Sequence, residues 1–165
     1  MKVKRDLSVK KLTMTGVMAA LIAALTIFPH IPNMAGGYVH LGDGLIMLAV
    51  MLLGPLAVPA AAIGSMIADL LTYPPYAVAT LIVKALMAVA ALLIYRKNNR
   101  RTLLPAFIAG ELVMVAGYFV YEIFLLGMGG ALADIPGNLI QGAAGVAMGY
   151  ALSNVVPQLE KGLKK

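Results

Sequence analysis

The sequence predicts an all-α integral membrane protein, a bundle of six transmembrane helices whose N and C termini both lie in the cytoplasm. Hydrophobic residues make up 61% of the 165-residue chain and charged residues 12%, whereas soluble domains hold about 45–50% apolar and about 25% charged residues. Lysine and arginine are concentrated in three short clusters, at residues 2–11, 96–101 and 161–165. Because cytoplasmic loops collect positive charge, we expect all three clusters on one side of the membrane, with an even number of crossings between them.

The apolar stretches between these clusters, residues 12–95 and 102–160, hold one basic residue, Lys84. A helix needs about 20 apolar residues to cross about 30 Å of hydrocarbon. Helices of this kind give four crossings in the first stretch and two in the second, so the chain is expected to be one membrane domain. The expected crossings are residues 12–29, 41–54, 57–72, 77–95, 103–126 and 135–156.

Proline and glycine mark the ends of these crossings. The first ends at Pro29, the Gly-Pro pair at residues 54–55 divides the second from the third, and the Tyr-Pro-Pro-Tyr sequence at residues 73–76 precedes the fourth. The second and third are short for a bilayer, so we expect them to be tilted, partly unwound or shielded by neighbours. One long kinked helix is the alternative, but it would place residues 96–101 outside.

A glycine-rich turn is expected between the fifth and sixth crossings. It holds Gly127, Gly129 and Gly130, and Asp134 is expected to cap the helix that follows. The outer loops are then residues 30–40, 72–77 and 127–134. Proline and tyrosine in these loops suit either a lid over a pocket or plain connections with tyrosine in the interfacial belt.

Several polar side chains fall inside the hydrocarbon, where a charge costs about 2.5–3.5 kcal/mol at the bilayer centre, so they should face the interior of the bundle. Glu111, Tyr118 and Glu122 lie within about 40° of one another around the fifth helix. Asn138 and Gln141 share a face of the sixth helix. Together with the tyrosines of the outer loops, these residues predict a polar pocket in the outer half of the bundle. The candidate binding residues are Tyr38, His40, Asp69, Tyr73, Tyr76, Lys84, Tyr118, Glu122, Asn138 and Gln141.

Lys84 allows two interpretations. It either contacts a ligand or pairs with Asp69 or Glu111 to hold the helices in register, because a desolvated ammonium needs a carboxylate in both cases. Asp43 comes just before the apolar run of the second crossing and is expected to cap that helix.

Small residues form one face of the first helix. They are Gly16, Ala19, Ala20, Ala23 and Ala24. Small residues spaced by four let another helix approach closely. That helix is either internal, with the glycines at residues 142–149 as the facing surface, or part of a partner protein.

Several kinds of chemistry are absent from the sequence. No G-x-x-x-x-G-K-[ST] loop is present, so the chain is not expected to hydrolyse ATP itself. None of the three serines lies in a G-x-S-x-G elbow, and no H-E-x-x-H motif accompanies His30 and His40. We therefore expect no enzyme activity, no cofactor and no metal in this chain. The net charge is +6, and the basic residues that produce it flank apolar segments. This placement favours contact with membrane lipid and not with nucleic acid.

Short motifs in order along the chain are similar to those of a known family. They are residues 36–43 (G-G-Y-V-H-L-G-D), 53–55 (L-G-P), 63–70 (with I-G-S and A-D-L) and 80–84 (T-L-I-V-K). By these motifs the chain resembles the substrate-binding S components of energy-coupling factor (ECF) vitamin transporters. The resemblance covers most of the chain and agrees with its size and expected topology.

The resemblance implies a multi-pass subunit of the cytoplasmic membrane of a prokaryote that captures a vitamin or precursor from outside. It implies docking on a transmembrane coupling (T) subunit and two ATP-binding-cassette subunits, which use the ATP. It also places the docking surface on the small-residue face of the first helix.

Within that family the chain looks most like the branch assigned to hydroxymethylpyrimidine or pyridoxine. Both ligands are small, nearly neutral rings that bear a hydroxymethyl group, which is consistent with Tyr118, Glu122, Asn138 and Gln141 as hydrogen-bonding partners. Pantothenate, a monoanion that Lys84 could pair with, is the next candidate. A stand-alone proton-coupled transporter and an intramembrane enzyme remain the alternatives to the capture role.

Overall fold

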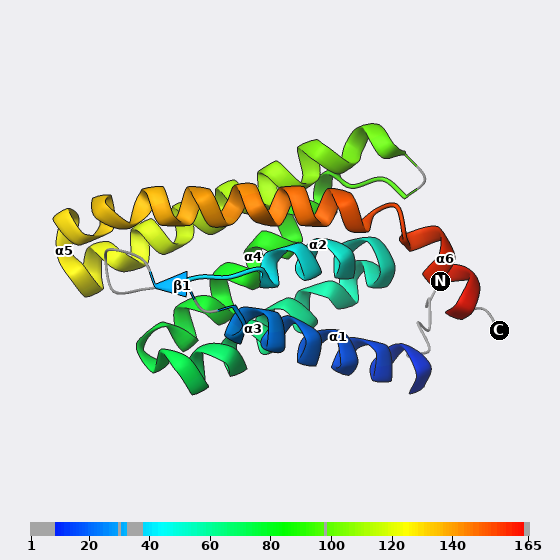
Figure 1. The fold of residues 1–165 in the computed structure, drawn as a ribbon, viewed down its shortest axis with the longest axis horizontal. Coiled ribbons are helices and arrows are strands. Elements are labelled where there is room, and N and C mark those ends of the chain that lie inside the picture. Colours follow the sequence, from blue (N-terminus) through cyan, green and yellow to red (C-terminus); the bar gives the residue numbers. More distant parts are fainter. Residues whose placement is uncertain (1–8, 30, 33–37, 98, 164–165) are drawn as a thin grey trace, which may run out of the picture.

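The structure is an almost entirely helical bundle with one short β-hairpin (Figure 1). This computed structural model describes residues 9–29, 31–32, 38–97 and 99–163. Helix α1 (Val9–Ile27) is followed by strands β1 (Ile31–Pro32) and β2 (Tyr38–Val39), which pair antiparallel with Ile31 opposite Val39. The hairpin therefore holds β2 beside the start of the next helix.

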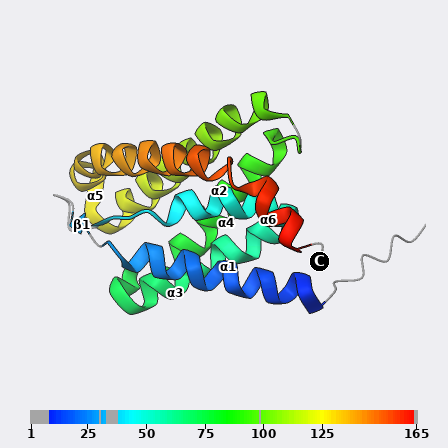
Figure 2. The same cartoon turned by 45° about the vertical axis from the view of Figure 1, so that its right-hand side comes forward.

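The chain reverses between α2 (Gly42–Leu53) and α3 (Ala57–Thr72) through the short 3-10 turn η1 (Gly54–Leu56). Gly54 has a φ of 57°, a left-handed conformation that glycine adopts without strain. Pro55 follows as the second residue of the turn, where its missing N–H is not needed. Figures 1 and 2 show α3 running back beside α2. The predicted break at Gly54-Pro55 is thus confirmed.

Helix α4 (Ala77–Ile94) begins after the proline-containing turn η2 (Pro74–Tyr76), and η3 (Arg100–Thr102) leads into α5 (Leu103–Leu152). Helix α5 consists of two helices joined at Gly127, whose φ of 77° and ψ of 171° are not helical. Figure 1 shows the second half running back along the first. The two halves of α5 therefore form a hairpin of long helices.

The glycine-rich turn is shorter than the sequence predicted. A single non-helical residue, Gly127, reverses the chain within α5, and residues 128–134 are helical. Asp134 is consequently a buried residue inside the helix and not its cap. The expected sixth helix also ends earlier, at Leu152, and a turn separates it from the short helix α6 (Val156–Leu163).

Helix α2 forms the centre of the core. Every residue from Gly42 to Met51 is buried, because α1, α3, α4 and α5 all pack against this helix. Its 12 residues extend only about 18 Å at the usual helical rise, less than the thickness of a hydrocarbon core. Neighbouring helices surround it, which is one of the arrangements expected for so short a helix.

The outer surface of the bundle carries large apolar side chains, with Leu71, Val78, Leu93 and Phe124 each at least 70% exposed. A surface of this kind is typical of contact with a membrane. Four stretches of the described residues are long and apolar enough to cross one: Val9–Ile27, Gly42–Thr72, Pro74–Ile94 and Arg100–Leu152. The second and fourth of these stretches contain the reversals at η1 and Gly127.

Candidate functional site

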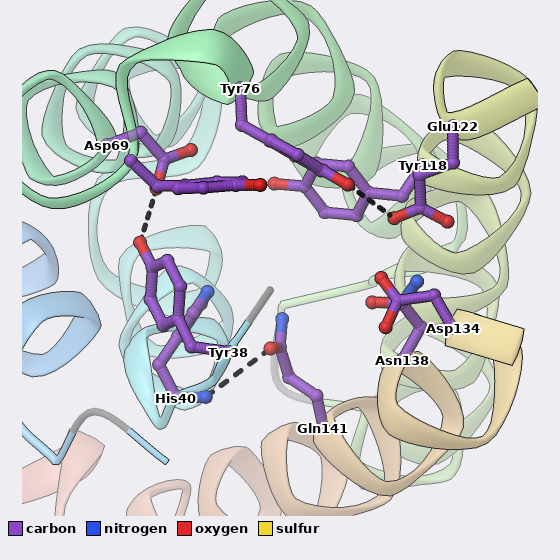
Figure 3. A pocket seen from close by; sticks show the side chains of 10 residues that line it. Tyr38, His40, Asp69, Tyr76, Tyr118, Glu122, Asp134, Asn138 and Gln141 are labelled. Carbon is purple, nitrogen blue, oxygen red and sulfur yellow. Dashed lines mark hydrogen bonds between the residues drawn. The ribbon is translucent and has the colours of Figure 1, made fainter. Parts of the chain in front are cut away.

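A pocket opens at the end of the bundle where β2, the turn between α3 and α4, and both halves of α5 meet (Figure 3). It holds about 370 Å³ of space free of atoms, counted out to its open mouth. Four tyrosines and three carboxylates dominate its walls. The lining residues are Tyr38, His40, Asp69, Tyr73, Tyr76, Tyr118, Glu122, Asp134, Asn138 and Gln141.

The β-hairpin positions one wall of the pocket. The hydroxyl of Tyr38, on β2, donates a hydrogen bond to the carboxylate of Asp69 on α3. Thr72, one turn further along α3, donates to the same hydroxyl at 3.2 Å. The ring of Tyr38 also lies against His40, with 5.6 Å between the ring centroids. These contacts tie the loop before α2 to the C-terminal end of α3.

Aromatic rings form a second wall. Tyr76 lies at the centre of a cluster, with its ring centroid 5.0 Å from that of Tyr73, 6.0 Å from that of Tyr118 and 5.2 Å from that of Tyr121. The Tyr118 hydroxyl shares a 2.9 Å hydrogen bond with Thr80 on α4. Fixed tyrosines of this kind offer a flat apolar surface together with polar tips, which suits stacking on a small ring.

The two halves of α5 contribute a carboxylate-rich wall. Tyr76 donates a hydrogen bond to Glu122 Oε1 at 3.3 Å, and Figure 3 shows Glu122 and Asp134 facing each other near Asn138. Glu122 Oε2 and Asn138 Nδ2 are buried without a hydrogen-bond partner among the described residues. Buried polar atoms are nearly always paired. An acceptor and a donor therefore remain open at this wall.

The floor of the pocket rests on a buried ion pair. Lys84 Nζ lies 2.5 Å from Asp43 Oδ1, and neither side chain is exposed at all. The Lys84 ammonium also lies 5.4 Å from the centre of the Tyr118 ring, which is close enough for cation–π attraction. Gln141 Nε2 donates to the other oxygen of Asp43 at 2.8 Å, and Gln141 Oε1 accepts from the backbone N–H of His40 at 3.4 Å.

Nine of the ten residues that the sequence singled out line this pocket, and Lys84 lies beneath it. Lys84 was expected to pair with Asp69 or Glu111 if it did not contact a ligand. That pairing was wrong, because the Lys84 side chain pairs with Asp43. The capping role expected for Asp43 was also wrong, since α2 begins at Gly42 and no side chain caps it. Much of the loop considered as a lid, residues 30 and 33–37, lies outside the described residues, so the lid stays a prediction.

Asp134 lines the pocket, although it was expected only as a helix cap and was not among the candidate binding residues. Its place after the glycine run and before Pro136 matches the pattern of a helix cap, and this pattern concealed it. One signal could have found it. Asp134 stands four residues before Asn138 and seven before Gln141, which is the spacing of a single helix face.

Glycines in the second half of α5 make room for Glu111 on the first half. A β-carbon at Gly145 would collide with a carboxylate oxygen of Glu111, and one at Gly142 would lie 3.3 Å from the Glu111 β-carbon. Gly149 likewise faces Met47 and Phe107. These glycines therefore pack within α5 and against α2, and the suggestion that they face the small residues of α1 was wrong.

The small-residue face of α1 is divided between two environments. Ala23 is buried, and Ala19 meets α3 so closely that a β-carbon at Gly64 would overlap its carbonyl group. Gly16, Ala20 and Ala24, by contrast, are exposed. Two of the five residues thus pack inside the chain, and the other three form an exposed stripe of small side chains.

A second hollow lies at the opposite end of the bundle, and we call this end the inner rim. It is lined by Met51, Tyr95, Lys97, Asn99, Arg100, Leu103, Ser153, Val156, Pro157 and Glu160. Lys97 Nζ pairs with Glu160 Oε1 at 2.6 Å, and this hydrogen bond raises the pKa of Lys97. Arg100 donates to Asn154 Oδ1 at 2.8 Å. Figure 1 shows the start of α1, the α4–α5 connection and α6 at this same end.

The chain matches one known family model and is similar to two known proteins. The sequence pattern of the family described as "ECF-type riboflavin transporter, S component" matches residues 6–158. The chain is 33% identical over 138 residues to an uncharacterized protein in a gap 3' region of Pyrococcus woesei, covering 82% of this chain and 93% of that protein. It is also 33% identical over 167 residues to the thiamine precursor transporter HmpT of Lactococcus lactis subsp. cremoris (strain MG1363), covering 96% of this chain and 92% of that protein.

Proposed function

The chain belongs to the family of ECF-type transporter S components, and from this premise we propose that it captures hydroxymethylpyrimidine or a closely similar single-ring vitamin precursor. Family membership makes it a membrane transport subunit for a vitamin or precursor, in a family of transporter subunits and not of enzymes. The observation that carries the proposed ligand is the pair of unpaired atoms, Glu122 Oε2 and Asn138 Nδ2, in the wall of the pocket.

A hydroxyl group satisfies both of these atoms at once. It donates its hydrogen to the Glu122 carboxylate and accepts one from the Asn138 amide. A hydroxymethyl group brings such a hydroxyl on a short arm, so that the ring itself can lie against Tyr76 and Tyr118. This arrangement supports a ring with a hydroxymethyl substituent, a feature that hydroxymethylpyrimidine and pyridoxine share.

The size of the pocket supports a single ring. The 370 Å³ counted above includes open solvent at the mouth of the pocket, so the enclosed space is smaller than that figure. A tricyclic ligand with a sugar-alcohol chain, such as riboflavin, would need a larger space. The family takes its description from riboflavin transport, whereas HmpT is described as a thiamine precursor transporter, and the volume favours the smaller ligand.

The charge of the pocket argues against an anion. Asp69, Glu122 and Asp134 line it, and the described lining residues include neither lysine nor arginine. Lys84 is engaged with Asp43 below the floor. Pantothenate was considered because Lys84 could neutralise it, and this support is lost once Lys84 is committed to Asp43. A neutral or protonatable ring with hydrogen-bond donors suits the pocket better.

We also propose six membrane crossings, with the pocket facing outward and the inner rim in the cytoplasm. The reversals at η1 and Gly127 divide two of the four apolar stretches into antiparallel helices. Apart from Lys84, the described lysines and arginines belong to the start of α1, the α4–α5 connection and α6. Figure 1 shows these three segments at the inner rim, where the positive-inside rule expects positive charge. A reporter tag inserted after Arg101 should be protected from external labelling in intact cells, and external labelling would contradict this topology.

Ligand binding by the purified chain, without nucleotide, tests the proposed function. The sequence has seven tyrosines and no tryptophan, so a change in tyrosine fluorescence reports directly on rings such as Tyr76 and Tyr118. We expect submicromolar binding of hydroxymethylpyrimidine and at least about tenfold weaker binding of the analogue with methyl in place of hydroxymethyl, because Glu122 and Asn138 then stay unpaired. Pyridoxine, pantothenate and riboflavin complete the set of probes.

Two results would contradict the proposal. Equal affinity for the hydroxymethyl and methyl compounds would show that Glu122 and Asn138 do not bind the hydroxyl group. Tighter binding of pantothenate or riboflavin would show that the ligand belongs to another class. Uptake into cells should require co-expression of the T subunit and the two ATPase subunits. Uptake by the chain alone, driven by a proton gradient, would favour a secondary transporter instead.

A further inference from the structure

Gln141 joins the pocket to the buried ion pair beneath it. Its side chain lines the pocket, and its Nε2 donates to Asp43 Oδ2 at 2.8 Å while its Oε1 accepts from the His40 backbone N–H at 3.4 Å. Asp43 Oδ1 is held by Lys84 at 2.5 Å. A continuous chain of polar contacts thus runs from His40 through Gln141 and Asp43 to Lys84.

These contacts leave the Gln141 amide a single orientation. The Asp43 carboxylate only accepts hydrogen bonds, and the His40 backbone N–H only donates. Turning the amide by 180° would place a carbonyl oxygen against a carboxylate and an NH₂ group against an N–H. Both contacts would then be repulsive, so the network fixes the amide from both sides.

The fixed amide determines what the pocket presents to a ligand. The second hydrogen of Nε2 is directed to Met114 Sδ at 4.0 Å, and Met114 is not among the described residues that line the pocket. The free lone pair of Oε1 is what remains for a ligand, because an amide oxygen can accept two hydrogen bonds. At this point of its floor the pocket is therefore a hydrogen-bond acceptor.

We propose that Asp43, paired with Lys84, is a positioning residue that fixes Gln141 as an acceptor and thereby selects rings carrying an amino group over rings carrying a carbonyl at the same place. This inference rests on the proposed function and narrows it. In hydroxymethylpyrimidine the amino group is next to the hydroxymethyl arm, so the amino group meets Gln141 when the hydroxyl meets Glu122 and Asn138. A 4-oxo ring presents an oxygen to the Gln141 oxygen and is rejected.

Two matched double variants test the role of Asp43. Asp43→Asn with Lys84→Met and Asp43→Ala with Lys84→Met both remove the ion pair as a unit, so neither leaves a buried charge without a partner. They differ in one respect, since asparagine still offers Gln141 an oxygen and alanine does not. The measurement is the ratio of dissociation constants of 4-amino-5-hydroxymethyl-2-methylpyrimidine and its 4-oxo counterpart, determined by calorimetry on each purified variant.

The wild type should prefer the amino compound by at least about tenfold, because the oxo compound leaves Gln141 unpaired. The asparagine variant should keep that ratio within about threefold, and the alanine variant should lose most of it. Asp43→Val with Lys84→Met is a second acceptor-free variant, which fills more of the vacated volume if the alanine variant does not fold. Equal ratios in the asparagine and acceptor-free variants would overturn the inference.

Glu160→Gln is the control. Glu160 pairs with Lys97 at the inner rim and is outside the chain of contacts from His40 to Lys84, so the ratio should not change. A wild-type protein that binds the amino compound without preferring it would refute this inference and leave the proposed function intact. A wild-type protein that binds neither probe would refute both.

Discussion

The centre of the bundle and the inner rim each hold a lysine paired with a carboxylate at nearly the same distance. Lys84 and Asp43 are 2.5 Å apart and wholly buried, whereas Lys97 and Glu160 are 2.6 Å apart with Lys97 62% exposed. Distance alone would rank the two pairs as equals. Burial separates them, because removing one partner strands a charge in the core but returns a charge to water at the rim.

The largest effect is expected from breaking the buried pair on one side. Lys84→Met leaves Asp43 without its cation and should lower the free energy of unfolding by about 3–5 kcal/mol. Thermal unfolding in detergent measures the loss. The double variant Asp43→Asn with Lys84→Met should recover most of it, since both charges are gone. A double variant as unstable as the single one would show that the two regions do not differ in the way described.

The next effect concerns ligand affinity, with one substitution made at each region. Glu122→Gln removes the carboxylate in the pocket wall and should weaken binding of hydroxymethylpyrimidine by about 1.5–3 kcal/mol, the range for hydrogen bonds to charged groups. The same substitution at the inner rim, Glu160→Gln, is the matched control and should leave affinity unchanged. Equal losses at both positions would mean that the effect is general and not local to the pocket.

Helix α1 extends the comparison to uncharged side chains. Ala19→Leu places a larger group against α3 at Gly64 and should destabilise the protein by about 1–3 kcal/mol. Ala20→Leu, one position away on the exposed stripe, should change stability by less than about 0.5 kcal/mol. We expect Ala20→Leu to keep ligand binding but to prevent co-purification with the T and ATPase subunits. Normal assembly of this variant would exclude the stripe as the docking surface.

The smallest effect is expected at the inner rim itself. Lys97→Gln breaks an exposed ion pair, and such pairs typically contribute about 0.2–1 kcal/mol to the free energy of unfolding. Unfolding in low and high salt should show little difference between the variant and the wild type. A loss comparable to that of Lys84→Met would indicate that this end of the bundle is more tightly packed around Glu160 than its exposure suggests.

Much of the pocket could be predicted because polarity is costly inside hydrocarbon. Tyr118, Glu122, Asn138 and Gln141 interrupt apolar helices, and their spacing places each pair on one helix face. The breaks at Gly54 and Gly127 could be predicted because few other residues tolerate such backbone conformations. The sequence therefore identified both the polar groups and the reversals that bring them together.

The partner of Lys84 could not be predicted in the same way. Asp69 and Glu111 were the partners expected for Lys84, and the choice among carboxylates depends on which helices are neighbours. Asp43 also stood where a cap is expected, just ahead of an apolar run, and so was set aside. Asp134 was missed for a related reason, since a glycine run and a following proline are signals of a turn. In both cases the neighbouring residues in the sequence matched a helix cap, whereas the side chain takes part in a site formed by residues distant in the sequence.

Gly127 has a consequence for how ligand size is controlled. Its φ of 77° and ψ of 171° belong to a region of backbone space that is essentially restricted to glycine, and an added β-carbon there would touch nothing within 4 Å. Glu122 lies just before this joint and Asp134 just after it. The separation of these two opposing side chains, and hence the width available to a guest molecule, is governed by the torsion angles of a residue that contacts neither.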